Sequence, residues 1–406
     1  MRGMNNTRLK NILKEPLAYG LNVSSEFDDH NMPRYIRITD FDDFNNLNDQ
    51  TFKSLPIEIA QSALLKDGDL LFARSGASVG KTYLYKQLPN GACYAGYLIK
   101  ARFNKHVVNP QYVYYFTKSQ QYENWKNATY IQATIQNISA EKYYQLPIYL
   151  PSIKAQDRMV AYLDTKLSEI DHQVSLLTSK RDAYLRLKKS IINRAVTKGL
   201  NPDVQMKDSG IEWIGEVPEG WEACRFKDFI TLKTNSSFSD AKIGLENIEG
   251  KNGRFVKTDT EFEGNGIAFK KDDIVYGKLR PYLQKVWIAE FEGNAVGDFY
   301  VFSVKVNAVP TYIKYLFLSD GFTYEVNSST VGAKMPRVSS NFILTMCYCL
   351  PTKTEQHSIS TYLDDKCSKI DRIISNLDKQ ISKYGELKRS LIDEVITGKR
   401  DCIAIR

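Results

Sequence analysis

The segment Gly80-Lys81-Thr82 has residue types that could bind the phosphates of a nucleotide. A phosphate-binding loop has a glycine, four further residues and then Gly-Lys-Ser/Thr, but here Ser75 stands where the first glycine belongs. The residues that follow, TYLYKQLPNG, alternate and then turn, which predicts a strand, whereas such a loop leads into the amino end of a helix. We therefore expect a hairpin turn, and a nucleoside triphosphatase is the weakest function that the sequence allows.

The sequence offers little else for catalysis or metal binding. The six cysteines form no C-x-x-C pair and the four histidines are scattered, which favours reduced, packed thiols over a zinc site. No nucleophile elbow, dinucleotide turn or methyl-transfer segment is present, so we expect a chain that is not an enzyme and has no cofactor or metal of its own. The net charge of +8 suits a polyanionic partner, and the lack of a long apolar run predicts a cytoplasmic protein.

Several loop segments carry basic, amide or hydroxyl side chains beside aromatic residues. Arginine and lysine read guanine in a DNA groove, asparagine and glutamine read adenine, and serine or threonine reads either. These segments predict contact with double-stranded DNA. The candidate DNA-binding residues are Arg34, Arg37, Arg74, Ser75, Lys81, Gln132, Thr134, Gln136 and Asn137 in the first half of the chain, and Lys278, Arg280, Tyr282, Lys285, Lys334 and Arg337 in the second.

The chain contains an internal repeat of about 200 residues. The 48-residue segments that begin at Leu150 and Leu350 align without a gap and are identical at 18 positions. Further upstream the match drifts, so that DLLFARSGASVGKTY from Asp69 corresponds to DIVYGKLRPYLQKVW from Asp273. The second copy has no Gly-Lys-Thr at that place, which again favours a turn whose tip differs between the copies.

Each repeat ends in a segment with the heptad spacing of a coiled coil. Polar residues interrupt the apolar seam at Arg181, Lys188 and Lys388, where they could fix the register. Two such helices tethered in one chain favour mutual, antiparallel pairing. The sequence thus predicts an α+β protein with a globular part over residues 1–150, a helix over 151–198, a linker and second globular part over 199–350, and a helix over 351–400. The two globular parts are separated by two long antiparallel coiled-coil helices, with an internal pseudo-twofold repeat.

This order of parts, with the segments GDLLFARSGASVGK, YGKLRPYLQKV, GAKMPRVS and GIEWIGEVPEGWE, resembles the specificity subunit of type I restriction–modification enzymes. The resemblance implies two target recognition domains joined by a central and a C-terminal conserved helix, and a bipartite target whose unlike half-sites make it asymmetric.

The same resemblance implies particular partners. These are two methyltransferase subunits, which bind S-adenosylmethionine and methylate adenine N6, and two restriction subunits, which use ATP and Mg. We expect partners to dock along the surfaces from Gln156 to Ile170 and from Gln356 to Ile370. A scaffold that joins two protein-binding modules through a coiled coil is the main alternative.

Overall fold

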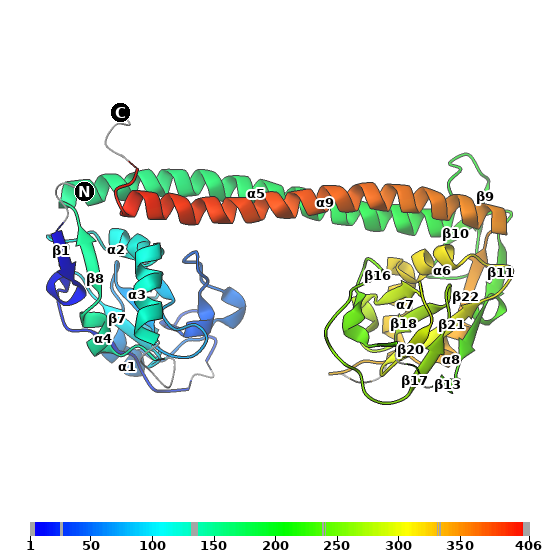
Figure 1. Cartoon of the computed structure of the whole chain (residues 1–406), viewed down its shortest axis with the longest axis horizontal. Helices are drawn as coiled ribbons and strands as arrows, with labels where there is room; N and C mark the ends of the chain where they lie inside the picture. The colour runs from blue at the N-terminus through cyan, green and yellow to red at the C-terminus, as the bar shows by residue number, and fades with distance from the viewer. Residues whose placement is uncertain are drawn as a thin grey trace. The chain divides into compact units, whose positions relative to one another are not determined.

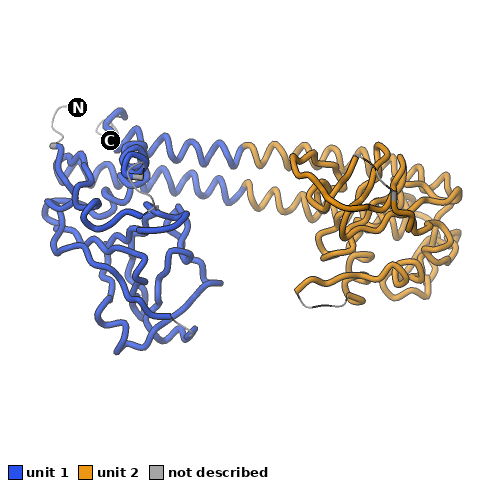
Figure 2. Tube along the Cα trace, turned by 60° about the horizontal axis from the view of Figure 1, so that its bottom comes forward, with its two compact units in different colours: residues 1–176, 380–406 blue, residues 177–379 orange. Residues whose placement is uncertain are grey.

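The computed structural model describes residues 5–24, 27–130, 137–237, 239, 241–330, 332 and 334–400. The chain forms two compact units, one of residues 1–176 and 380–406 and one of residues 177–379 (Figure 2). Each unit has a globular α+β part and a portion of each of two long helices, α5 (Ile153–Lys198) and α9 (Lys353–Ile396) (Figure 1). The units divide both long helices, whereas the sequence-based division treats each helix as a separate segment.

The globular part of the first unit is built on a four-stranded antiparallel sheet in the order β2-β7-β4-β5. A parallel pair, β3-β6, and an antiparallel pair, β1-β8, complete its strands. The strands are β1 (Asn5–Arg8), β2 (Ala18–Tyr19), β3 (Arg34–Ile36), β4 (Leu70–Ala73), β5 (Thr82–Leu84), β6 (Ala92–Tyr94), β7 (Leu98–Ala101) and β8 (Pro147–Leu150). The short helices are α1 (Ile57–Ala60), α2 (Pro110–Phe116), α3 (Gln120–Tyr130) and α4 (Ala140–Tyr144).

The globular part of the second unit has two four-stranded sheets, β12-β21-β18-β19 and β13-β17-β20-β14. Its strands are β9 (Met206–Asp208), β10 (Glu216–Pro218), β11 (Glu222–Arg225), β12 (Ile230–Lys233), β13 (Ser236–Ser237), β14 (Lys242–Ile243), β15 (Ile248–Glu249), β16 (Arg254–Phe255), β17 (Gly266–Phe269), β18 (Ile274–Gly277), β19 (Val286–Ile288), β20 (Gly293–Ala295), β21 (Phe299–Val304) and β22 (Cys347–Leu350). Its helices are the 3₁₀ turn η7 (Pro281–Leu283), α6 (Pro310–Phe317), α7 (Asp320–Ser328) and α8 (Ser340–Thr345).

The apolar seam of the long helices is buried within each unit. In the first unit, Leu163 and Ile170 of α5 join Leu391 and Val395 of α9 in a core that also contains the sheet. In the second unit, Ile192 and other residues late in α5 share a core with residues early in α9. Near the ends of each long helix the heptad residues bury their side chains, as the narrow apolar stripe indicated, whereas Leu177 and Tyr184 in the middle of α5 are half-buried. No helix in the described part of the chain has an apolar stretch of the length that a membrane crossing needs.

A buried glutamine clamps the start of each long helix to the globular part that precedes it. The Oε1 atom of Gln156 accepts from the backbone N–H of Asn109 at 2.9 Å, and its Nε2 donates to the carbonyl of Pro151. Gln356 accepts from the N–H of Val309 at 2.9 Å and donates in the same way to a proline carbonyl. Both glutamines are fully buried. They cannot belong to a docking surface for partners, which corrects that part of the sequence-based expectation.

The polar residues that interrupt the seam form ion pairs between the two long helices. The ammonium of Lys188 lies 2.8 Å from a carboxylate oxygen of Asp371, and that of Lys388 lies 2.6 Å from Asp171. The lysines are related by the repeat, and so are the aspartates. Their surroundings differ, because the side chain of Asp371 is 18% exposed and that of Asp171 is 60% exposed.

This difference predicts unequal effects for two matched substitutions. Lys188→Met leaves a largely buried carboxylate with one cation fewer and should lower the free energy of unfolding by about 3 kcal/mol. Lys388→Met leaves a carboxylate that water can solvate and should cost about 1 kcal/mol or less. Urea unfolding of the two variants measures the difference, and equal losses would contradict this account of the seam.

Candidate nucleic-acid interface

Equivalent turns occupy the tips of two hairpins, one in each unit. β4 pairs antiparallel with β5 in the first unit, and β18 pairs with β19 in the second. In the first turn Gly76 and Gly80 have left-handed backbones, with φ of 76° and 81°. The repeat aligns these glycines with Arg280 and Gln284, whose φ values are 51° and 50°. The two glycines of GASVGKT therefore allow a left-handed backbone in the turn, and the second copy adopts the same backbone with other residues.

The lysine of Gly80-Lys81-Thr82 has an internal role that the repeat also reproduces. The Nζ atom of Lys81 donates to the carbonyl of Phe41 at 2.5 Å. The equivalent Lys285 donates to the carbonyls of Leu245 at 2.6 Å and Ile248 at 2.8 Å. Ile248 follows a capped 3₁₀ turn, as Phe41 does in the first unit. Burial lowers the pKa of Lys285. Both lysines tie a neighbouring loop to the hairpin, which gives each a structural role, and a strand follows the motif as predicted.

Two other candidates, Arg34 and Arg37, are also engaged inside the first unit. The Arg34 guanidinium is buried, 2.8 Å from Asp49, and donates to the carbonyl of Asn48. Arg37 donates two hydrogen bonds to the buried carboxylate of Asp40, which raises the pKa of the guanidinium. We correct the prediction for Arg34, because its side chain is buried and cannot reach a DNA groove. Arg37 is 34% exposed, so its contact with DNA stays a prediction.

The structure brings Arg74, Ser75 and Asn137 together on the first unit. Ser75 and Asn137 form an antiparallel β-bridge, and the carbonyl of Arg74 accepts from the N–H of the next residue, Ile138, at 2.9 Å. The guanidinium of Arg74 lies over the ring of Tyr19, 4.9 Å from its centroid. The remaining candidates here, Gln132, Thr134 and Gln136, lie outside the described residues.

A matching cluster forms on the second unit. Leu279 and Arg337 make the equivalent bridge, and the N–H of Arg280 donates to the carbonyl of Pro336 at 2.8 Å. Arg337 donates two hydrogen bonds of 3.0 Å to Asp298. Lys278, Lys334 and Tyr282 lie on the same segments, and Tyr282 is 48% exposed. Arginine, lysine and tyrosine thus gather where two loops meet, as a surface that reads bases requires.

Sequence reasoning missed exposed tyrosines beside both clusters. Tyr97 is 61% exposed, and its carbonyl accepts from the N–H of Arg74 at 3.0 Å. Tyr324 of α7 is 74% exposed, and α7 packs against η7, which carries Tyr282. An exposed tyrosine is a good platform for a sugar or a base. The chain has 25 tyrosines, and composition does not show which of their rings are exposed. These two could therefore not be selected from the sequence.

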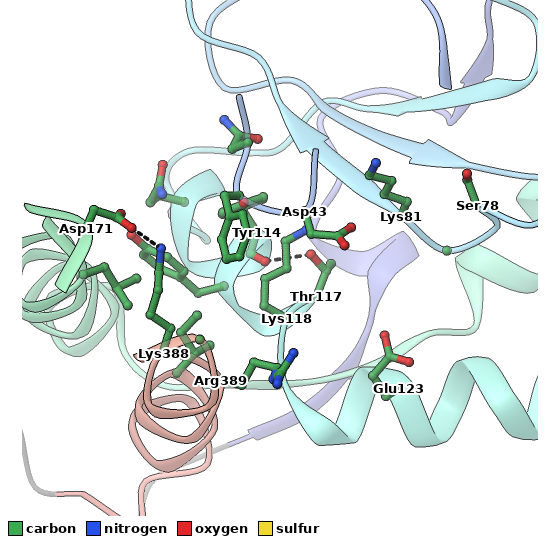
Figure 3. A pocket seen from close by; sticks show the side chains of 18 of the residues that line it. Asp43, Ser78, Lys81, Tyr114, Thr117, Lys118, Glu123, Asp171, Lys388 and Arg389 are labelled. Atoms are coloured by element: carbon green, nitrogen blue, oxygen red, sulfur yellow. Dashed lines mark hydrogen bonds and ion pairs between the residues drawn. The ribbon is translucent and has the colours of Figure 1, made fainter. Parts of the chain in front are cut away.

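A cavity of about 920 Å³ lies in the first unit between the hairpin turn, α2 and both long helices. Figure 3 shows Lys81, Lys118 and Lys388 around it, with the ion pair between Lys388 and Asp171 drawn as a dashed line. Burial lowers the pKa of Lys118 to about 8, and its ammonium lies 3.4 Å from the carbonyl of Thr82. Each of these three lysines donates to an acceptor within its own unit, so the cavity is lined by ammonium groups that already hold parts of the fold together.

Three of the five described cysteines, Cys93, Cys349 and Cys367, are buried as packed thiols would be, whereas Cys224 is half-buried and Cys347 is exposed. All five that the structure describes are free, and burial raises the pKa of Cys93 to about 12. Within the described residues, no three histidine, cysteine, aspartate or glutamate side chains are grouped as metal ligands.

The sequence of this chain is similar to several known proteins. Residues 4–176 match the family described as type I restriction modification DNA specificity domain. The type I restriction enzyme MjaVIII specificity subunit of Methanocaldococcus jannaschii is 20% identical, over 83% of this chain and 80% of its own length. The StySPI specificity subunit of Salmonella potsdam is 22% identical, over 87% and 81%.

Solved structures show the same α+β fold. A chain from a study of complex assembly and conformational transition in the type I R-M system superimposes with a TM-score of 0.71, at 13% identity and with 98% of both chains covered. The HsdS subunit of Thermoanaerobacter tengcongensis gives 0.51 at 14% identity, with the same coverage. The chain is thus similar to type I restriction enzyme specificity subunits over most of its length, which supports the resemblance seen in the sequence. These relatives are named as specificity subunits, which fits the expectation of a chain that is not itself an enzyme.

The internal role of Lys81 leads to a stability prediction. Lys81→Met removes the donor to the Phe41 carbonyl and should lower the free energy of unfolding by about 1–3 kcal/mol. The salt dependence of DNA binding should stay unchanged, because a lysine that contacts no phosphate releases no counterion. Denaturant unfolding and a salt titration of DNA binding test both parts. A reduced salt slope with unchanged stability would show that Lys81 contacts DNA.

Proposed function

We propose that this chain is the DNA sequence-recognition subunit of a type I restriction–modification system. The observation that carries the proposal is the pair of equivalent hairpin turns with unlike residues at equivalent positions. Ser75 and Asn137 form the bridge in the first unit, where Leu279 and Arg337 form it in the second. Different side chains on the same backbone would let the two globular parts recognise different base sequences. The names of the relatives support the same function.

In this proposal each globular part is a target recognition domain that docks on one half-site of double-stranded DNA. Symmetric dimers read palindromes. Two recognition domains with unlike surfaces therefore read an asymmetric, bipartite target.

We further propose that α5 and α9 form an antiparallel coiled coil with pseudo-twofold symmetry, which sets the gap between the half-sites. Support comes from each unit separately. The early part of α5 shares a core with the late part of α9 in the first unit, and the late part of α5 shares one with the early part of α9 in the second. At 1.5 Å per residue, a helix of 46 residues is roughly 70 Å long, enough to act as a spacer.

Partners supply the chemistry in this proposal. Two methyltransferase subunits bind S-adenosylmethionine and methylate adenine N6, and two restriction subunits use ATP and Mg. This chain contributes recognition and spacing, and it holds none of these cofactors. The buried Gln156 and Gln356 move the expected docking surface toward the exposed faces of α5 and α9.

A domain exchange tests the modular part of the proposal. Residues 1–149 are replaced by the recognition domain of a related subunit, and methylated sites are mapped in cells that carry the methyltransferase partner. One half-site should change while the other stays the same. A change in both half-sites would show that the domains read jointly, and methylation without any sequence preference would favour the scaffold alternative.

An insertion tests the spacing role of the helices. Seven residues placed between Ser175 and Thr178 return each seam residue to its own face and lengthen α5 by roughly 10 Å. At about 3.4 Å per base pair, the gap between the half-sites should grow by up to about three base pairs. Four inserted residues move the seam off its face and should abolish methylation. An active seven-residue variant with an unchanged gap would show that the partner subunits hold the spacing.

A further inference from the structure

The turn of the second unit adopts a backbone that its residues disfavour. Arg280 has φ 51° and ψ 65°, and Gln284 has φ 50° and ψ 47°. Glycine adopts this left-handed region freely, but a β-carbon crowds the backbone there. Pro281 adds a further restriction, because the residue before a proline prefers an extended backbone. At the equivalent positions the first unit has Gly76 and Gly80, which satisfy the same shape without strain.

Contacts inside the fold account for Gln284. Its side chain is only 5% exposed, and Nε2 donates to the hydroxyl of Thr323 at 2.7 Å and to the carbonyl of Leu318 at 3.1 Å. Its own carbonyl accepts from the N–H of Lys251 at 3.1 Å. A glycine at this position would lose the two side-chain hydrogen bonds that fix the turn on α7.

Arg280 has no comparable explanation inside the fold. The residue is exposed, and the hydrogen bond of its guanidinium is a long one, 3.4 Å from Nη2 to the carbonyl of Lys334. The nearby Arg337 instead makes two bonds to a carboxylate, that of Asp298. Within the described part of the chain, the guanidinium of Arg280 pairs with no carboxylate. A strained backbone is a feature of functional sites, and here it carries an exposed side chain held by one long hydrogen bond.

We infer that Arg280 is a specificity-determining residue, which reads a guanine in the half-site bound by the second globular part. This inference rests on the proposed function and narrows it to one side chain and one base. Arginine can donate two hydrogen bonds to O6 and N7 of guanine in the major groove, a pattern that no other base offers. Gln284 is a positioning residue in this arrangement, because it holds the turn from which Arg280 projects.

Two substitutions of Arg280 separate an effect on base recognition from an effect on the stability of the fold. Arg280→Gly and Arg280→Ala both remove the guanidinium, but only the glycine relieves the backbone. Each full-length variant is co-expressed with the methyltransferase partner, and methylated sites are mapped. At one G·C position of one half-site, discrimination should fall about tenfold or more in both variants, and the other half-site should be unchanged.

Melting temperatures supply the second readout. Arg280→Gly should melt no lower than the unaltered chain and higher than Arg280→Ala. Gly76→Ala calibrates the effect in the first unit, because a β-carbon added there meets no atom within 4 Å and only the backbone conformation resists it. That variant should melt lower. An Arg280→Gly variant that melts lower than the unaltered chain would show that the arginine stabilises the fold, and would overturn the inference.

The exposed Lys334 provides a charge-matched control on the same face. Lys334→Ala should weaken binding to all sequences alike and leave base discrimination intact. If Arg280→Gly keeps the motif of the unaltered chain at full discrimination, or behaves like Lys334→Ala, the inference is wrong while the proposed function stands. If the unaltered chain directs methylation to no defined motif, the proposed function fails and the inference fails with it.

Discussion

The two buried lysines, Lys188 and Lys388, which pair with aspartates across the long helices, are the constraint on which the rest of the structure depends. A charge without a partner inside a seam is far more expensive than a mismatched apolar side chain, so each lysine fixes how the two helices align. Lys188 also donates to Asn252 of a surface hairpin at 3.0 Å, and Arg254 of that hairpin lies 2.8 Å from the same Asp371. One carboxylate therefore joins both helices to the globular part of its unit.

Contacts continue from this hairpin to the candidate reading turn. The N–H of Lys251, beside Asn252, donates to the carbonyl of Gln284 at the end of the turn. In the first unit, equivalent segments join the helix seam to the hairpin turn, but through different kinds of contact. The ammonium of Lys388 lies over the ring of Phe44, 4.5 Å from its centroid, and Lys81 ties the loop that carries Phe44 to the hairpin. Each of the two hairpin turns is thus connected to the helix seam of its own unit by packed, hydrogen-bonded residues, which fix the position of the turn within that unit.

Much of the fold could be predicted because its signals are periodic or repeated. Heptad spacing locates the long helices, and a second copy of the sequence reveals that Gly80-Lys81-Thr82 is a turn. The candidate site was predicted less well, because residue type does not report burial. Arg34, Lys81 and Lys285 have the chemistry of base readers, but internal carbonyls and carboxylates use their donors. No local pattern distinguishes such an arginine or lysine from an exposed one.

The two copies differ in their exposed residues far more than in the residues that hold the framework. Asp69 and Asp273 each accept from the backbone N–H three residues earlier, at 2.8 Å in both units. The buried glutamines and the hairpin lysines likewise repeat their contacts. Changes occur at the turn tips and the bridges, where Gly76 and Ser75 stand opposite Arg280 and Leu279. Under the proposed function, such a fold acquires a new DNA sequence when its exposed tip residues change and its framework stays fixed. The limit on such change is the left-handed backbone of the turn, which favours glycine wherever a side chain has nothing to read.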